Sequence, residues 1–155
     1  MIHRRLLLAA ALAAPCAARA HHGWSSFDQT RPIWLEGRAT QVTWRNPHAE
    51  LKLELPAQPR LPADLAGRAL PAQAAGVDGQ ALLAAARLPT RRDKVWLIEL
   101  APLTRLSAWK MPEIKPGATL AVLGFTFTDE KGDAVLRAEY VWLDGQAYGL
   151  RSSPA

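Results

Sequence analysis

The chain has 155 residues, a formal net charge of +5 at neutral pH and one cysteine, Cys16. This length suits one domain with a modest core. Asp93 interrupts the densest basic cluster, Arg91, Arg92 and Lys94, so no basic run indicates nucleic-acid binding. No segment is long and apolar enough to predict a lasting membrane helix.

The first twenty residues are typical of an export signal. A basic start precedes an apolar run from Leu6 to Ala14, and Ala18-Arg19-Ala20 has the small-x-small pattern that signal peptidases cleave after. We therefore expect residues 1–20 to be removed and a protein beginning at His21 to be periplasmic or secreted. Cleavage would lower the net charge to about +2 and remove Cys16, so no thiol would remain for disulfides or metal binding.

Two strands are expected at the start of the domain. Ile33 to Arg45 is rich in β-branched and aromatic residues, which predicts a long strand with Glu36-Gly37 as a bulge. Residues 48–55 alternate between polar and apolar side chains, which indicates a half-buried strand. The inward face changes from even to odd positions between them, and proline donates no ladder hydrogen bond. We therefore expect a corner at Asn46-Pro47, with His48 just after it.

Residues 56–92 differ in composition, being rich in alanine, proline, glycine and glutamine and lacking apolar periodicity. This predicts a long inserted loop with one short helix near Gly79 to Arg87, capped by Asp78. Because loop length changes closure entropy only slowly, we expect the rest of the domain to fold without this insertion.

The second half of the chain returns to regular patterns. Leu103, Leu106 and Trp109 have helical spacing, and Gly124 marks a change of apolar face that would place both Val122 and Phe125 inside. Strands are expected at Val95–Leu100, Thr119–Thr128 and Val135–Leu143, followed by a short return at 146–150.

Five strands with a helical connection between the third and fourth favour an all-β fold. We predict a small five-stranded barrel that resembles the oligonucleotide/oligosaccharide-binding fold, within a single monomeric domain at residues 21–155. A β-sandwich is the alternative. Leu51, Leu53 and Trp44 are expected inside the barrel.

Histidines 21, 22 and 48 are the candidate metal ligands. Cleavage before His21 frees an amine beside its imidazole, and copper(II) favours such nitrogen ligands. His48 would add a third nitrogen if an ordered, irregular arm at residues 25–32 folds back over the barrel. Alternatively, His22 binds with its own backbone amide. The alternative without a metal is that His21 and His22 are remnants of the cleavage site and that His48 is a turn residue.

Other residues near His48 suit a supporting role. Glu50 lies two positions further along the same strand face, where it would orient the imidazole or simply face solvent. Trp44 and Asn46 would line the site. The chain has six tryptophans, and aromatic rings on a barrel face either stack on sugars and bases or pack the core.

Nothing in the sequence indicates an enzyme. There is no nucleophile motif and no glycine-rich phosphate loop. Asp28, Glu36 and Glu139 are charged residues for which the sequence identifies no partner.

The chain resembles a family of small exported bacterial proteins of unknown function. The matching segments are Ala20-His21-His22-Gly23, the stretch from Gly37 to His48, and Lys115 to Gly124. Trp44-x-Asn46-Pro47-His48 is the most specific part, whereas Arg38-Ala39 departs from the valine typical of the family. The resemblance implies an exported, barrel-like domain and supplies no activity.

These observations predict a periplasmic, non-enzymatic protein that binds copper through His21, His22 and His48. Its partner would be the metal ion or an envelope protein, and the cofactor would be copper or none. The alternative is a ligand- or protein-binding accessory module of the cell envelope that holds no metal.

Overall fold

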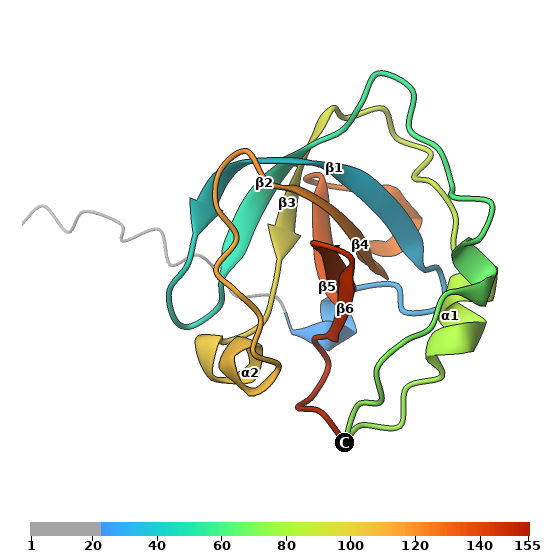
Figure 1. The fold of residues 1–155 in the computed structure, drawn as a ribbon. Helices are drawn as coiled ribbons and strands as arrows, with labels where there is room; N and C mark the ends of the chain where they lie inside the picture. The colour runs from blue at the N-terminus through green and yellow to red at the C-terminus, as the bar shows by residue number, and fades with distance from the viewer. Residues whose placement is uncertain (1–22) are drawn as a thin grey trace, which may run out of the picture.

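Six strands form one sheet that curls on itself into a barrel (Figure 1). The computed structural model describes residues 23–155. The sheet has the order β3-β2-β1-β4-β5-β6, and β3 also pairs with β5 in parallel, which closes a five-stranded barrel. The strands are β1 (Ile33–Thr43), β2 (Glu50–Glu54), β3 (Val95–Glu99), β4 (Thr119–Phe125), β5 (Val135–Leu143) and β6 (Gln146–Gly149).

This closure confirms the predicted all-β barrel and excludes the sandwich. Helix α2 (Leu103–Ala108) connects β3 to β4, as the resemblance to the oligonucleotide/oligosaccharide-binding fold requires. Within residues 23–155, none of the helices combines the length and apolar character needed to cross a membrane.

The barrel interior is apolar and fully buried. Leu51, Leu53 and Val122 are at most 1% exposed and lie in the interior cluster, as predicted. Trp44 is only half-buried, but it packs against this cluster. Leu106 of α2 joins the same cluster, so the helix is part of the interior packing.

The bulge in β1 lies further along the strand than predicted. Ala39 pairs with Leu53 and Gln41 pairs with Lys52, so the extra residue is Thr40 and not Glu36-Gly37. Gly37 serves another purpose, because a Cβ there would lie 2.2 Å from the carbonyl oxygen of Glu54. It therefore permits a close approach of two backbones.

The predicted change of face at Gly124 is wrong. Leu123 pairs with Tyr140 and Gly124 pairs with Ala138, so the extra residue, Glu139, lies on β5. Strand β4 thus keeps its alternation. Phe125 shares the outer face of Leu123 and lies in a separate cluster with Phe27 and Val135, outside the interior cluster where it was expected.

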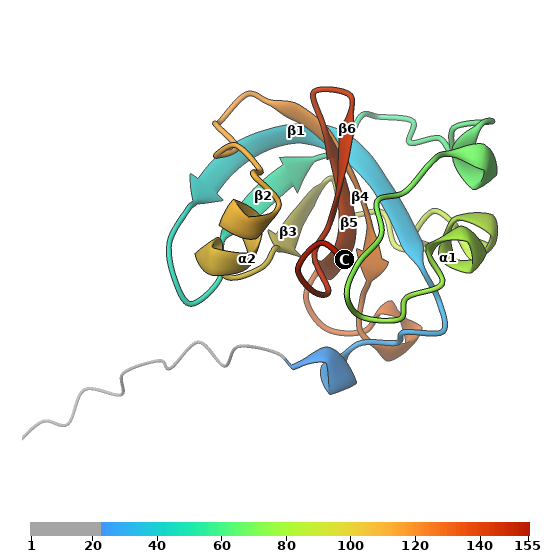
Figure 2. The same ribbon diagram turned by 60° about the horizontal axis from the view of Figure 1, so that its bottom comes forward.

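The insertion lies against the outside of the barrel beside β1, and α2 lies on the other side in both views (Figures 1 and 2). It contains a 3₁₀ helix at Leu65–Gly67 and α1 (Gly79–Ala85). As predicted, Asp78 caps α1, its Oδ1 accepting a hydrogen bond from the Ala81 amide at 2.9 Å.

The insertion nevertheless contributes buried residues to a cluster outside the barrel. Leu65 and Leu83 are buried in one cluster with Trp34, Leu123 and Tyr140, which project from the outer face of the barrel. The two leucines are too far apart in sequence to produce a periodic signal. Because this part of the outer face is apolar, the insertion must cover it to keep it away from water.

The segment before β1 is the ordered, irregular arm that the sequence predicts. It begins with a 3₁₀ helix at Trp24–Ser26. The Phe27 ring stacks on Phe127 with centroids 5.1 Å apart, and the Asp28 amide donates to the carbonyl of Thr126 at 2.9 Å. The arm is therefore attached along the end of β4.

Candidate metal-binding face

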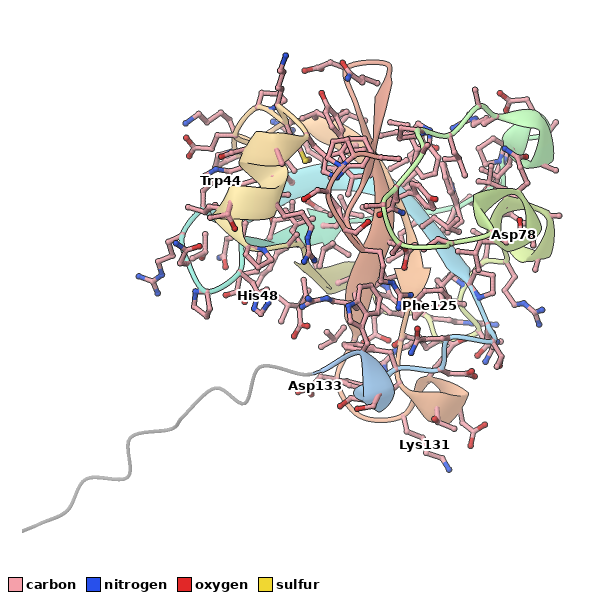
Figure 3. All side chains as sticks on the ribbon, turned by 90° about the horizontal axis from the view of Figure 1, so that it is seen from below. Trp44, His48, Asp78, Phe125, Lys131 and Asp133 are labelled. Carbon is pink, nitrogen blue, oxygen red and sulfur yellow. The ribbon has the colours of Figure 1, made fainter. Side chains whose placement is uncertain are left out.

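His48 lies in the connection between β1 and β2, at the corner that the sequence predicts (Figure 3). The Asn46 side-chain oxygen accepts a hydrogen bond from the Leu103 amide at 3.3 Å, which ties the corner to α2. The next residue, Ala49, is buried and exchanges backbone hydrogen bonds with Leu100 and Ala101. His48 is thus held between two fixed points and is half-buried.

A row of charged side chains crosses the outer face of the barrel next to His48. Glu50 pairs in register with Glu99, and Glu99 pairs with Arg137 on β5. The Arg137 guanidinium donates to the Glu99 carboxylate at 3.3 Å, and the two side chains are 7% and 13% exposed. We call His48, Glu50, Glu99 and Arg137 the His48 face.

Burial lowers the pKa of Arg137, although the neighbouring Glu99 carboxylate acts in the opposite direction. Its Nε atom is buried without a hydrogen-bond partner. Arg137, at one end of the row, thus supplies a desolvated positive charge that fixes the position of Glu99.

Trp24 of the N-terminal arm packs beside this face. The Arg151 guanidinium carbon lies 3.6 Å from the centroid of the Trp24 ring, and that of Arg137 lies 5.2 Å away. Phe125 contacts the same ring edge-on at 6.3 Å. Stacking of cations on an indole is favourable, so these contacts hold Trp24 in place.

Arg151 is itself held by a buried carboxylate. Glu139, fully buried at the extra residue of β5, accepts hydrogen bonds from Arg151 and, at 3.1 Å, from Gln73. The Arg151–Glu139 ion pair is 2.6 Å long. A buried carboxylate with two such donors fixes the arginine that supports Trp24.

The predicted ligands are only partly described by the structure. His21 and His22, like the predicted signal, lie outside residues 23–155. Across the described range, no group of three or more histidine, cysteine or acidic side chains is arranged to hold a metal ion. His48 and Glu50 are both half-buried on either side of the buried Ala49, Asn46 accepts a hydrogen bond from the start of α2, and Trp44 packs towards the interior.

Sequence reasoning missed Glu99, Arg137 and Arg151, and assigned no partner to Glu139. A signal existed, because Arg137 and Glu139 interrupt an otherwise apolar strand. Charged residues in such a strand are buried only with a partner. The sequence could not identify the partners, because Arg151 reaches Glu139 only through the turn between β5 and β6.

The fold and this face define a small closed β-barrel with an attached N-terminal arm. Residues 9–60 match the model of a family of unknown function (DUF6152). This match includes β1, the Asn46–His48 corner and β2, but less than half of the chain. No curated protein and no solved structure matches the chain.

Proposed function

We propose that this is an exported, non-enzymatic metal-binding protein that holds one copper(II) ion through the amine and ring of His21 and the ring of His48. His22 is the alternative N-terminal ligand. Glu50 would orient the His48 imidazole, whereas Trp44, which packs towards the interior, would support the corner from beneath. Copper(II) suits a set of nitrogen ligands, and the chain offers no thiolate after Cys16.

The attachment of Trp24 beside the His48 face is the observation that carries this proposal. Adjacent strands lie about 4.8 Å apart, so Glu50 is about 10 Å across the sheet from Arg137. His48 precedes Glu50 by two residues, which is about 7 Å of extended chain. Residue 21 precedes Trp24 by three positions and can reach about 10 Å from it. Histidine side chains then span the remaining distance, so ligands from both ends of this row can meet.

Copper binding by the exported protein tests the proposal. N-terminal sequencing should give His21 as the first residue. Isothermal titration and electron paramagnetic resonance should then show one copper(II) ion bound through nitrogen. Affinity should fall at least tenfold in His48→Ala and in a protein with one extra residue before His21, because each loses a ligand.

A matched pair of carboxylate variants tests the orienting role. Glu50→Gln should weaken copper binding, whereas Glu54→Gln, four residues along the same strand, should not. If the extended protein binds as tightly as the native one, the terminal amine is not a ligand and the proposal fails. The accessory-module alternative then becomes the better account.

A further inference from the structure

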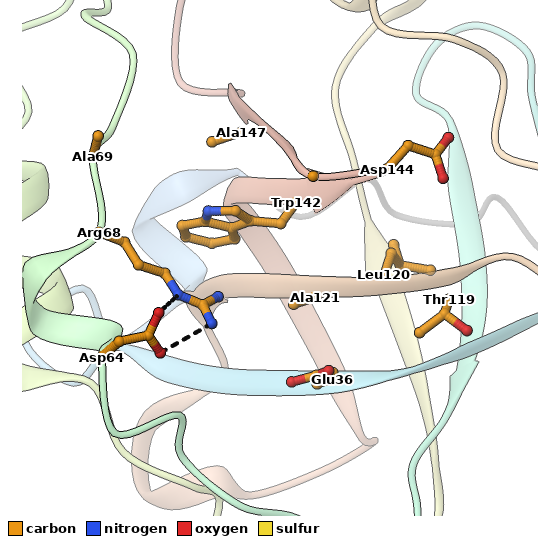
Figure 4. A pocket seen from close by; sticks show the side chains of 11 residues that line it. Glu36, Asp64, Arg68, Ala69, Thr119, Leu120, Ala121, Trp142, Asp144 and Ala147 are labelled. Carbon is orange, nitrogen blue, oxygen red and sulfur yellow. Dashed lines mark hydrogen bonds and ion pairs between the residues drawn. The ribbon is translucent and has the colours of Figure 1, made fainter.

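A groove of about 480 Å³ lies on the outside of the barrel, where the insertion meets it (Figure 4). Its floor is formed by β4 and by Ala147 of β6, and its walls include Trp142, Arg68, Glu36 and Asp144. Arg68 comes from the insertion, so the groove exists only where the insertion meets the barrel. We call it the Trp142 groove. None of its lining residues belongs to the His48 face.

Trp142 forms a rigid aromatic wall of this groove. The ring is half-buried and rests on two buried aromatic side chains, with centroids 5.0 Å from Trp34 and 6.2 Å from Tyr140. An aromatic ring fixed in this way loses little conformational entropy when a ligand stacks on it.

Arg68 is a fixed hydrogen-bond donor next to the ring. Its Nε and Nη2 atoms each donate to the Asp64 carboxylate at 3.2 Å, and its guanidinium carbon lies 5.3 Å from the Trp34 ring centroid. A guanidinium has five N–H donors. Those that Asp64 does not use remain available beside Trp142, as Figure 4 shows.

Two exposed carboxylates complete the polar lining. Glu36 and Asp144 make no ion pair within residues 23–155, so their oxygens can accept hydrogen bonds from a ligand. Since Asp64 offsets the charge of Arg68, the groove carries net negative charge. An anionic ligand is therefore disfavoured.

We infer that the Trp142 groove binds a neutral pyranose ring of a carbohydrate. A pyranose has C–H bonds on its faces, which stack on Trp142, and hydroxyl groups on its edge, which both donate and accept hydrogen bonds. Glu36 and Asp144 accept from these hydroxyls, and Arg68 donates to them. A mostly preformed concave site with a few convergent polar groups is the usual form of a small-ligand site.

The test uses the native protein with cellopentaose, chitopentaose, maltopentaose and an oligogalacturonate. Indole N–H signals in NMR spectra should identify Trp142 as perturbed by at least one neutral oligosaccharide at millimolar concentration. The oligogalacturonate, which carries a carboxylate on each ring, should not bind. Copper is absent from this assay, so its outcome is independent of the proposed metal site.

Variants then connect binding to the groove. Trp142→Ala should weaken binding at least tenfold, and Trp142→Phe should retain part of it. Glu36→Gln and Asp144→Asn leave the buried cluster intact and should each weaken binding severalfold, whereas the control Glu113→Gln should have no effect. The inference is overturned if no neutral oligosaccharide binds, or if binding survives unchanged in Trp142→Ala, Glu36→Gln and Asp144→Asn.

Discussion

The barrel has two apolar surfaces that are buried in different ways. The interior is closed by strands whose backbones are hydrogen-bonded all round, so its side chains have no room to rearrange. The outer cluster of Trp34, Leu123 and Tyr140 is covered by the insertion, whose leucines come from short helices joined by irregular segments. The first surface is rigid on all sides, and the second has one movable side.

Of the changes that test this comparison, replacing the insertion should lower the unfolding free energy the most. A protein in which residues 58–91 become a short Gly-Ser turn should still close its barrel, because Leu55 and Lys94 are hydrogen-bonded neighbours. It should lose at least about 5 kcal/mol of unfolding free energy, since three large side chains become exposed at about 1.5–3 kcal/mol each. Urea denaturation measures the loss, and an unchanged midpoint would show that the cover is dispensable.

Identical truncations compare the two surfaces directly. Leu53→Ala in the interior should cost about 3–5 kcal/mol, because a closed barrel cannot collapse into the cavity. Leu83→Ala, equally buried beneath the insertion, should cost about 2–3 kcal/mol, because α1 can settle towards the barrel. Denaturant unfolding of both variants checks the order, and equal losses would mean that the cover is as rigid as the barrel.

Acid should loosen the end of the insertion without affecting the interior. Glu130 is buried, accepts hydrogen bonds from the amides of Thr90 and Arg91 at 2.9 Å, and pairs with Arg31 at 2.7 Å. Burial raises its pKa, but these hydrogen bonds and the nearby Arg31 outweigh burial, so the pKa lies below its ordinary value of 4.5. This contribution to stability is complete above pH 4.5 and is lost as the pH falls through the lowered pKa.

Glu130→Gln should therefore lower the unfolding free energy at neutral pH by roughly 1–3 kcal/mol and flatten its decline in acid. Asp129→Asn, a change at the adjacent exposed carboxylate, is the control and should behave like the native protein. Thermal unfolding followed from pH 7 to pH 3 makes the measurement. An equally steep acid decline in Glu130→Gln would contradict the assignment.

The sequence predicted the strands well, because β2 alternates between buried and exposed residues and β4 and β5 are almost continuously apolar between turn residues. The corner at Asn46-Pro47 was predicted from the expected change of inward face between the first two strands. Phe125 was misplaced because a bulge on β5 has the same effect on pairing as one on β4, and a single strand's pattern cannot show which partner carries the extra residue. The cover of Trp34 was missed because contacts between distant segments leave no periodic signal.

The candidate site was less predictable than the fold. His48 and Glu50 lie two residues apart on either side of the buried Ala49, so their proximity follows from the local sequence. The supports of Trp24 come from Arg137 and Arg151, which lie more than a hundred residues later in the chain. No local pattern connects residues at such separation.

The contact between Trp24 and Arg151 also has a consequence for the order of folding. A ribosome produces Trp24 early, but Glu139 and Arg151, the arginine that stacks on the Trp24 ring, emerge only 115 and 127 residues later. Contacts between such distant residues form late, because the intervening chain must first be ordered. Attachment of the arm is therefore a final step, and hydrogen exchange during refolding should show protection of the β1–β2 hairpin before that of the Trp24–Asp28 amides.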